Sequence, residues 1–101
     1  MKKHIIISGK VQGVGFRYWL YKAATQRDVD GWVRNKTSGE VEALLIGNDV
    51  EINNLIQLCE KGPPLSKVKK IKVKNYFQQF FLLILIFDFQ MNIFLERSIF
   101  R

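Results

Sequence analysis

The sequence predicts an α+β fold of the split βαβ type, in which an antiparallel sheet carries two helices on one face. Short β-branched runs alternate with two stretches whose apolar residues recur every three or four positions. The resulting order is strand, helix, strand, strand, helix, strand (βαββαβ), and it accounts for residues from about 4 to 74. With 101 residues, 48% of them hydrophobic, the chain is expected to form one modest core.

The first strand and the first helix flank a loop rich in glycine. Residues 5–8 are a compact β-branched run that predicts the strand. From residue 16 onward the pattern changes to helical spacing, at Phe16, Trp19, Leu20, Ala23, Ala24 and Arg27. Between them, Gly13 and Gly15 allow positive φ angles and a close approach of backbone N–H groups to a ligand.

A hairpin, a second helix and a last strand follow. Residues 29–35 and 41–46 are strand-like and are joined by the turn-prone residues 36–39. Asn48 and Asp49 are candidate N-caps for a helix that ends at Gly62 and two prolines, and its apolar face carries Ile52, Leu55, Ile56 and Cys59. Ile71 and Val73 alternate with lysines, which predicts a strand in a partly exposed or edge position of the sheet.

Composition restricts the partners of the chain. The formal net charge of +7 favours anions, whether nucleic acid, acidic membranes or phosphorylated metabolites. The single Cys59 cannot form an internal disulfide, and no cysteine and histidine cluster has zinc spacing, so no metal is expected. The apolar run near the N-terminus is too short for a signal peptide, so a cytoplasmic location is expected.

Two polar features are expected to meet at one rim of the sheet. In the predicted topology the first and third strands are the central pair and the second strand lies beside the third. The glycine loop with Arg17 and the strand-ending Asn35 can then share an anion site, with Asn35 hydrogen-bonded to water. The alternatives are a tight strand-to-helix turn followed by a surface arginine, and an asparagine that only closes the hairpin.

Four ordered motifs resemble the signatures of the acylphosphatases: GKVQGVGFR at 9–17, GWVRN at 31–35, GEVE at 39–42 and GPPLSKV at 62–68. The resemblance covers roughly the first three quarters of the chain and implies the ferredoxin-like form of the split βαβ fold. It also implies hydrolysis of small acyl phosphates to a carboxylate and inorganic phosphate, without a metal or organic cofactor.

The resemblance assigns roles by motif position. It implies two catalytic residues, Arg17 as the phosphate-binding arginine and Asn35 as the residue that orients water. It implies a phosphate-binding loop made of Gln12, Gly13, Val14, Gly15, Phe16 and Arg17. The partners expected are a small acyl phosphate and inorganic phosphate, with no nucleic acid and no membrane span.

Residues 75–101 depart from the family pattern. We expect an acylphosphatase-like domain at 1–74 and an atypical hydrophobic segment at 75–101 that replaces the family's final strand. Its run of eight apolar residues at 80–87 is too short for a bilayer, which needs about twenty. The segment is a strand that extends the sheet, an oligomer-forming element, or sequence foreign to the fold; a monomer is expected unless it drives association.

Two other functions stay open from the sequence. Tyr18, Trp19, Tyr21 and Trp32 together with the basic charge also suit a ferredoxin-like RNA-binding module. The altered C-terminus also leaves open a catalytically impaired acylphosphatase-like protein. His4 is expected at an ordinary strand position and Cys59 in the core.

Overall fold

The computed structural model describes residues 1–75 and 97–99 of the chain. Over these residues the order is β1 (Lys2–Lys10), α1 (Phe16–Gln26), β2 (Asp30–Asn35), β3 (Val41–Ile46), α2 (Asp49–Lys61), β4 (Lys67–Asn75) and β5 (Arg97–Ile99). The strands form one sheet in the order β4-β1-β3-β2-β5, with antiparallel neighbours throughout. The α+β prediction is confirmed, including the adjacent β1 and β3 and the place of β2 beside β3.

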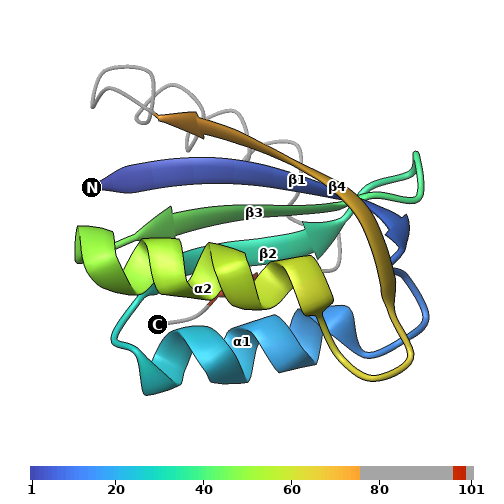
Figure 1. Ribbon diagram of the computed structural model, residues 1–101, viewed down its shortest axis with the longest axis horizontal. Helices are drawn as coiled ribbons and strands as arrows, with labels where there is room; N and C mark the ends of the chain where they lie inside the picture. Colours follow the sequence, from blue (N-terminus) through green and yellow to red (C-terminus); the bar gives the residue numbers. More distant parts are fainter. Residues whose placement is uncertain (76–96, 100–101) are drawn as a thin grey trace.

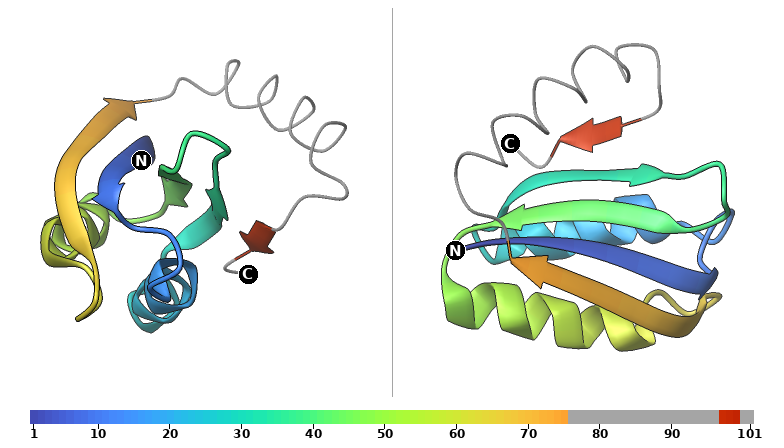
Figure 2. Two further views of the ribbon diagram at one scale, coloured as in Figure 1. Left: turned by 90° about the vertical axis from the view of Figure 1, so that its right-hand side faces the viewer. Right: turned by 90° about the horizontal axis from the view of Figure 1, so that it is seen from above.

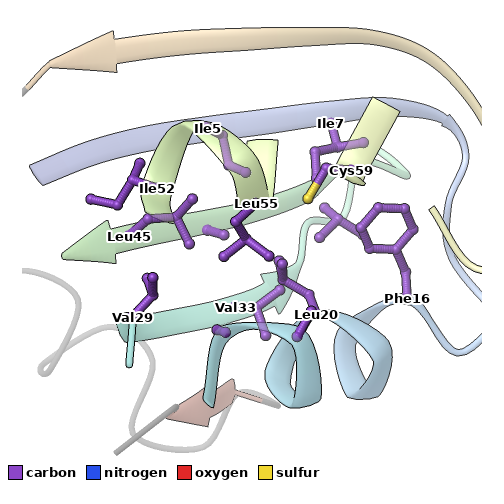
Figure 3. Packing of buried hydrophobic residues seen from close by; sticks show 14 of the residues in the cluster. Ile5, Ile7, Phe16, Leu20, Val29, Val33, Leu45, Ile52, Leu55 and Cys59 are labelled. Carbon is purple, nitrogen blue, oxygen red and sulfur yellow. The ribbon is translucent and has the colours of Figure 1, made fainter. Parts of the chain in front are cut away.

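Both helices cover the same face of the sheet (Figures 1 and 2). Alternate residues of β1 and β3 point toward the helices, so Ile5, Ile7 and Leu45 belong to the core under the helices and their chain neighbours face the other side of the sheet. The helices contribute Leu20 and Leu55 to the same cluster (Figure 3). One continuous core between the sheet and the helices therefore fixes the strands and helices whose ends carry polar residues.

The second helix begins and ends where its sequence predicts. The Asn48 side chain accepts hydrogen bonds from the N–H groups of Val50 at 2.8 Å and Glu51 at 3.3 Å, so Asn48 is the N-cap. Gly62 follows the last turn with a φ of 68°, an angle that favours glycine. Cys59 is fully buried on the apolar face of α2, and burial raises the pKa of its thiol to about 12.

The edge strand β4 contains a β-bulge. Ser8 pairs with Lys70 but Gly9 pairs with Val68, which leaves Lys69 as an extra residue. Val68 and Ile71 are three positions apart, yet both pack against the core, because the bulge reverses the alternation between them. The predicted edge position of this lysine-rich strand is confirmed, and its lysines are exposed.

The face of the sheet without helices carries a buried charged cluster. Glu42 of β3 accepts a hydrogen bond from His4 Nε2 of β1 at 2.6 Å and another from Arg34 Nε of β2. Arg34 also lies 5.6 Å from the centre of the Trp32 ring. His4 is thus a strand residue, as predicted, but its hydrogen-bond partner Glu42 lies 38 positions away in the sequence. The cluster links three adjacent strands.

The apolar run at 80–87 and the rest of 76–96 lie outside the described residues. Within the described part of the chain, neither helix is long and apolar enough to cross a bilayer.

The Glu42 cluster predicts a specific acid sensitivity. Burial alone would raise the pKa of Glu42, but hydrogen bonds and charge from His4 and Arg34 outweigh it and lower the pKa from 4.5 to about 2. Because the unfolded chain binds the proton more readily, this carboxylate stabilises the fold fully above its unfolded pKa. The contribution, at most about 3 kcal/mol, is lost as the pH falls toward 2.

Urea unfolding of the wild type and of Glu42→Gln across this pH range measures the effect. The free-energy difference between the two proteins is expected to shrink steadily below about pH 5, since other carboxylates titrate equally in both. A difference that stays constant down to pH 2 would contradict the assignment.

Candidate active site

The polar features predicted from the sequence meet at one end of the sheet. Strands β1 and β2 run in the same direction, since each is antiparallel to β3 between them. Their carboxyl ends lie together at the right-hand end of Figure 1, beside the loop of residues 11–15 and the hairpin turn that follows Asn35. The glycine loop and Asn35 are therefore neighbours although twenty residues separate Gly15 from Asn35 in the sequence.

Gly13 and Gly15 give the loop its shape. Their φ angles are 72° and 78°, in the left-handed region that side chains disfavour. A Cβ atom added at either position would meet nothing within 4 Å. Backbone conformation, and not lack of space, therefore requires glycine here. Val11 is buried at the start of the loop and attaches it to the core.

The start of α1 lacks the groups that close the start of α2. Gly15 occupies the N-cap position of α1, offers no side-chain hydrogen bond, and no acidic residue lies in the first turn. In α2, by contrast, Asn48 caps the helix and Asp49 and Glu51 lie in the first turn. The positive end of the α1 dipole is thus left without a neighbouring carboxylate in that first turn, as an anion site requires.

A pocket of about 160 Å³ joins these elements, and it is lined by Val11, Gly13, Gly15, Phe16, Arg17, Tyr18 and Asn35. The structure therefore brings together Gly13, Gly15, Phe16, Arg17 and Asn35 of the residues predicted from the sequence. Among the residues that line the pocket, Arg17 is the cation and none is a carboxylate. Such a lining suits a small anion.

Two predicted loop residues do not line the pocket. Val14 packs against the core, while the Gln12 carboxamide donates to the backbone carbonyls of Lys36 at 2.7 Å and Glu40 at 2.9 Å. Two residues that the sequence did not single out for the site, Val11 and Tyr18, do line it. Their sequence positions, next to the predicted loop and next to Arg17, could have indicated that they line the pocket.

Phe16 connects the loop to both helices. Its side chain is only 2% exposed and packs edge-on against Trp19, with ring centroids 5.3 Å apart. A Cβ atom at Gly62, just after α2, would lie 2.8 Å from the Phe16 ring. The first residue of α1 is therefore held in place by contacts on two sides.

A larger hollow of about 590 Å³ lies elsewhere, on the exposed sides of the two helices. It is lined by residues that include Arg27, Glu51 and Gln57, and none of the predicted site residues contributes to it. Its lining includes the Glu51 carboxylate beside a single guanidinium, so the smaller pocket is the better anion site.

Among the described residues, Tyr18, Trp19 and Trp32 do not form a row for stacking bases. Trp32 is buried on the sheet and Trp19 is half-buried against Phe16, on the other side of the β-layer. Tyr18 is 67% exposed, and the ammonium group of Lys22 lies 5.7 Å from the centre of its ring. This arrangement does not favour the RNA-binding alternative. Among the described residues no cluster of three or more histidine, cysteine or acidic side chains is placed to hold a metal ion.

Comparison with known proteins places the chain in a family. The family model for acylphosphatase matches residues 3–81. An acylphosphatase of Acidiphilium cryptum is 46% identical over 69 residues, which are 68% of this chain and 76% of that protein. The crystal structure of acylphosphatase from Bacillus subtilis superposes with a TM-score of 0.72 at 37% identity, over 76% of this chain and 88% of that one.

A larger protein contains a similar domain. The crystal structure of full-length HypF in its phosphate- and nucleotide-bound form matches 74% of this chain, with a TM-score of 0.70 at 32% identity. The matching part is 10% of the HypF chain, whereas the match to the Acidiphilium relative covers most of that protein. The chain belongs to the acylphosphatase family and is an enzyme that hydrolyses acyl phosphates.

Proposed function

We propose that this acylphosphatase hydrolyses small acyl phosphates in the pocket between residues 11–18 and Asn35. The observation that carries the proposal is the meeting of Arg17, the open start of α1 and Asn35 in one carboxylate-free pocket. The backbone N–H groups of residues 12–16 and the Arg17 guanidinium would hold the phosphoryl oxygens.

The reaction needs positioning more than it needs a strong base. Water attacks phosphorus, the bond from phosphorus to the acyl oxygen breaks, and the carboxylate leaves with the bonding electron pair. A carboxylate is a good leaving group, so no general acid is required. Arg17 and the loop stabilise the charge that develops on the phosphoryl oxygens as this bond breaks.

Asn35 orients the attacking water in this mechanism. Its side chain does not ionise near neutral pH, so its amide oxygen accepts a hydrogen bond from the water and does not remove a proton. A phosphoryl oxygen takes the proton of the water instead. This explains why the pocket needs no carboxylate or histidine, and the proposed reaction uses neither a metal nor an organic cofactor.

The proposal assigns catalysis to residues 1–74, with residues 75–101, which include β5 at the edge of the same sheet, in place of the family's final strand. All of the proposed site residues lie between positions 12 and 35. We place the enzyme in the cytoplasm, as a monomer unless the C-terminal segment drives association. Its partners are the acyl phosphate and inorganic phosphate.

Replacing Arg17 tests the phosphate site. Purified wild-type protein is expected to hydrolyse benzoyl phosphate without added metal, and inorganic phosphate is expected to compete. In Arg17→Ala, kcat/KM is expected to fall about 1,000-fold and phosphate inhibition to disappear, because the charged donor is lost. Arg17→Lys keeps the charge but lacks the planar guanidinium group, so its kcat/KM should lie between the values of the wild type and of Arg17→Ala. A folded Arg17→Ala protein with normal turnover would overturn the site assignment.

Replacing Asn35 separates binding from turnover. Asn35→Ala is expected to lower kcat about 100-fold or more while leaving the inhibition constant for inorganic phosphate nearly unchanged. Asn35→Asp has the same size and keeps an acceptor for water, but its charge repels the phosphate. It should therefore also raise KM. Equal kcat in wild type and in folded Asn35→Ala would eliminate the water-orienting role.

A matched pair at Gly15 tests the open start of α1. Asn and Asp both tolerate the left-handed conformation, and a Cβ at this position meets open space, so both variants should fold. Gly15→Asp places a negative charge at the pocket, and its phosphate inhibition constant should be at least about tenfold higher than that of Gly15→Asn. The difference between the two inhibition constants should become smaller at high salt, because salt screens the added charge. Indistinguishable constants would show that no anion binds there.

A further inference from the structure

The Gln12 side chain joins the two halves of the pocket. Gln12 lies in the loop between β1 and α1, and its carboxamide nitrogen donates to Lys36 O at 2.7 Å and to Glu40 O at 2.9 Å. Both acceptors belong to the hairpin turn between β2 and β3. Because the nitrogen carries two hydrogens, both donors of the side chain are directed to this turn.

These two carbonyls mark the base of the turn. Lys36 N–H donates to Glu40 O at 2.8 Å, and Gly39 N–H donates to Lys36 O at 3.1 Å. Asn35 precedes Lys36 directly and is the last residue of β2. Gln12 is therefore bonded to the backbone one residue beyond Asn35, and also to Glu40, the residue that directly precedes β3 on the other side of the turn.

Strand pairing does not connect Asn35 directly to the glycine loop, and the Gln12 side chain makes that connection. Asn35 pairs with Val41, and Val41 pairs on its other side with Ile7, so β3 stands between Asn35 and β1. The glycine loop begins beyond Lys10, past the end of this pairing. Sheet hydrogen bonds thus fix Asn35 relative to Ile7, whereas the Gln12 bonds fix the turn relative to the loop itself.

We infer that Gln12 is a positioning residue that sets the distance between the phosphate-holding loop and the water-orienting Asn35. The inference rests on the proposed function. Gln12 carries no side-chain contact to the pocket, whose lining excludes it. Its effect is on the relative place of two groups that must act together on one phosphoryl centre, where a displacement of about 1 Å can cost 100-fold in rate.

The consequence differs from that of a phosphate ligand. Without the Gln12 donors, the loop and Arg17 still hold the phosphoryl group, so KM and phosphate inhibition stay nearly constant. The water held by Asn35 is no longer aligned with the phosphorus atom, so kcat falls. A residue with a structural role alone would change the unfolding temperature and leave the kcat of the folded protein unchanged.

Two substitutions remove the donors at nearly constant size. Gln12→Met keeps the length of the side chain without its hydrogen bonds, and Gln12→Glu replaces the donor with a carboxylate oxygen that repels both carbonyls. We expect kcat for benzoyl phosphate to fall at least about tenfold in Gln12→Met, and further in Gln12→Glu. Ser38→Ala is the matched control, since it removes the Ser38 bond to the Glu40 carboxylate in the same turn and should leave kcat unchanged.

A double-mutant cycle with Asn35 decides the case. If Gln12 acts through Asn35, Gln12→Met should lower kcat by less than about twofold in the Asn35→Ala background. Full additivity of the two losses would overturn the inference, as would a rise in KM and in the phosphate inhibition constant at unchanged kcat.

An NMR measurement keeps this test separate from the proposed function. The side-chain amide resonances of Asn35 are expected to shift in Gln12→Met and to stay in place in Ser38→Ala, whether or not the protein turns over benzoyl phosphate. Unchanged Asn35 resonances in Gln12→Met would overturn the inference. Loss of activity in the wild type, with these shifts present, would instead count against the proposed reaction.

Discussion

The pairing of β3 with both β1 and β2 is the constraint on which the rest of the structure depends. It makes β1 and β2 parallel and brings the ends of both strands to one edge. A slip of one residue between β2 and β3 would turn Val33 out of the core and separate Arg34 from Glu42. The register is thus held from both faces, by apolar burial on one side and by an ion pair on the other. The same register fixes the direction of Asn35, the last residue of β2.

Much of this architecture could be predicted from the sequence, because the relevant signals are local. Helical spacing, the Asn48 cap and the Gly62 stop act within a few residues, and the topology then brings Arg17 and Asn35 to one rim. What could not be predicted depends on distances between remote segments. The bulge at Lys69 cannot be recognised in the sequence of β4, where lysines already alternate with apolar residues. The contact of Gln12 with a turn 24 residues away is equally invisible in its motif.

The two helices divide stability and chemistry between them. At the start of α2, Asn48 caps the free N–H groups and acidic residues in the first turn compensate the positive end of the helix dipole. The start of α1 has Gly15 in place of a capping side chain, which leaves its first turn less stable and better able to receive an anion. The buried Phe16 ring offsets this weakness by attaching the same turn to the core and to the residue after α2.

Cys59 gives the molecule an internal reporter of its own opening. It is the single thiol of the chain, it is fully buried, and burial raises its pKa to about 12. Thiol reagents react with the thiolate, so labelling must wait until α2 leaves the sheet. In the limit of rapid reclosing, the labelling rate then measures the free energy of that opening, residue-specifically and without denaturant. Because Cys59 does not react in the folded state, a fluorophore can be attached selectively to a cysteine introduced on the surface.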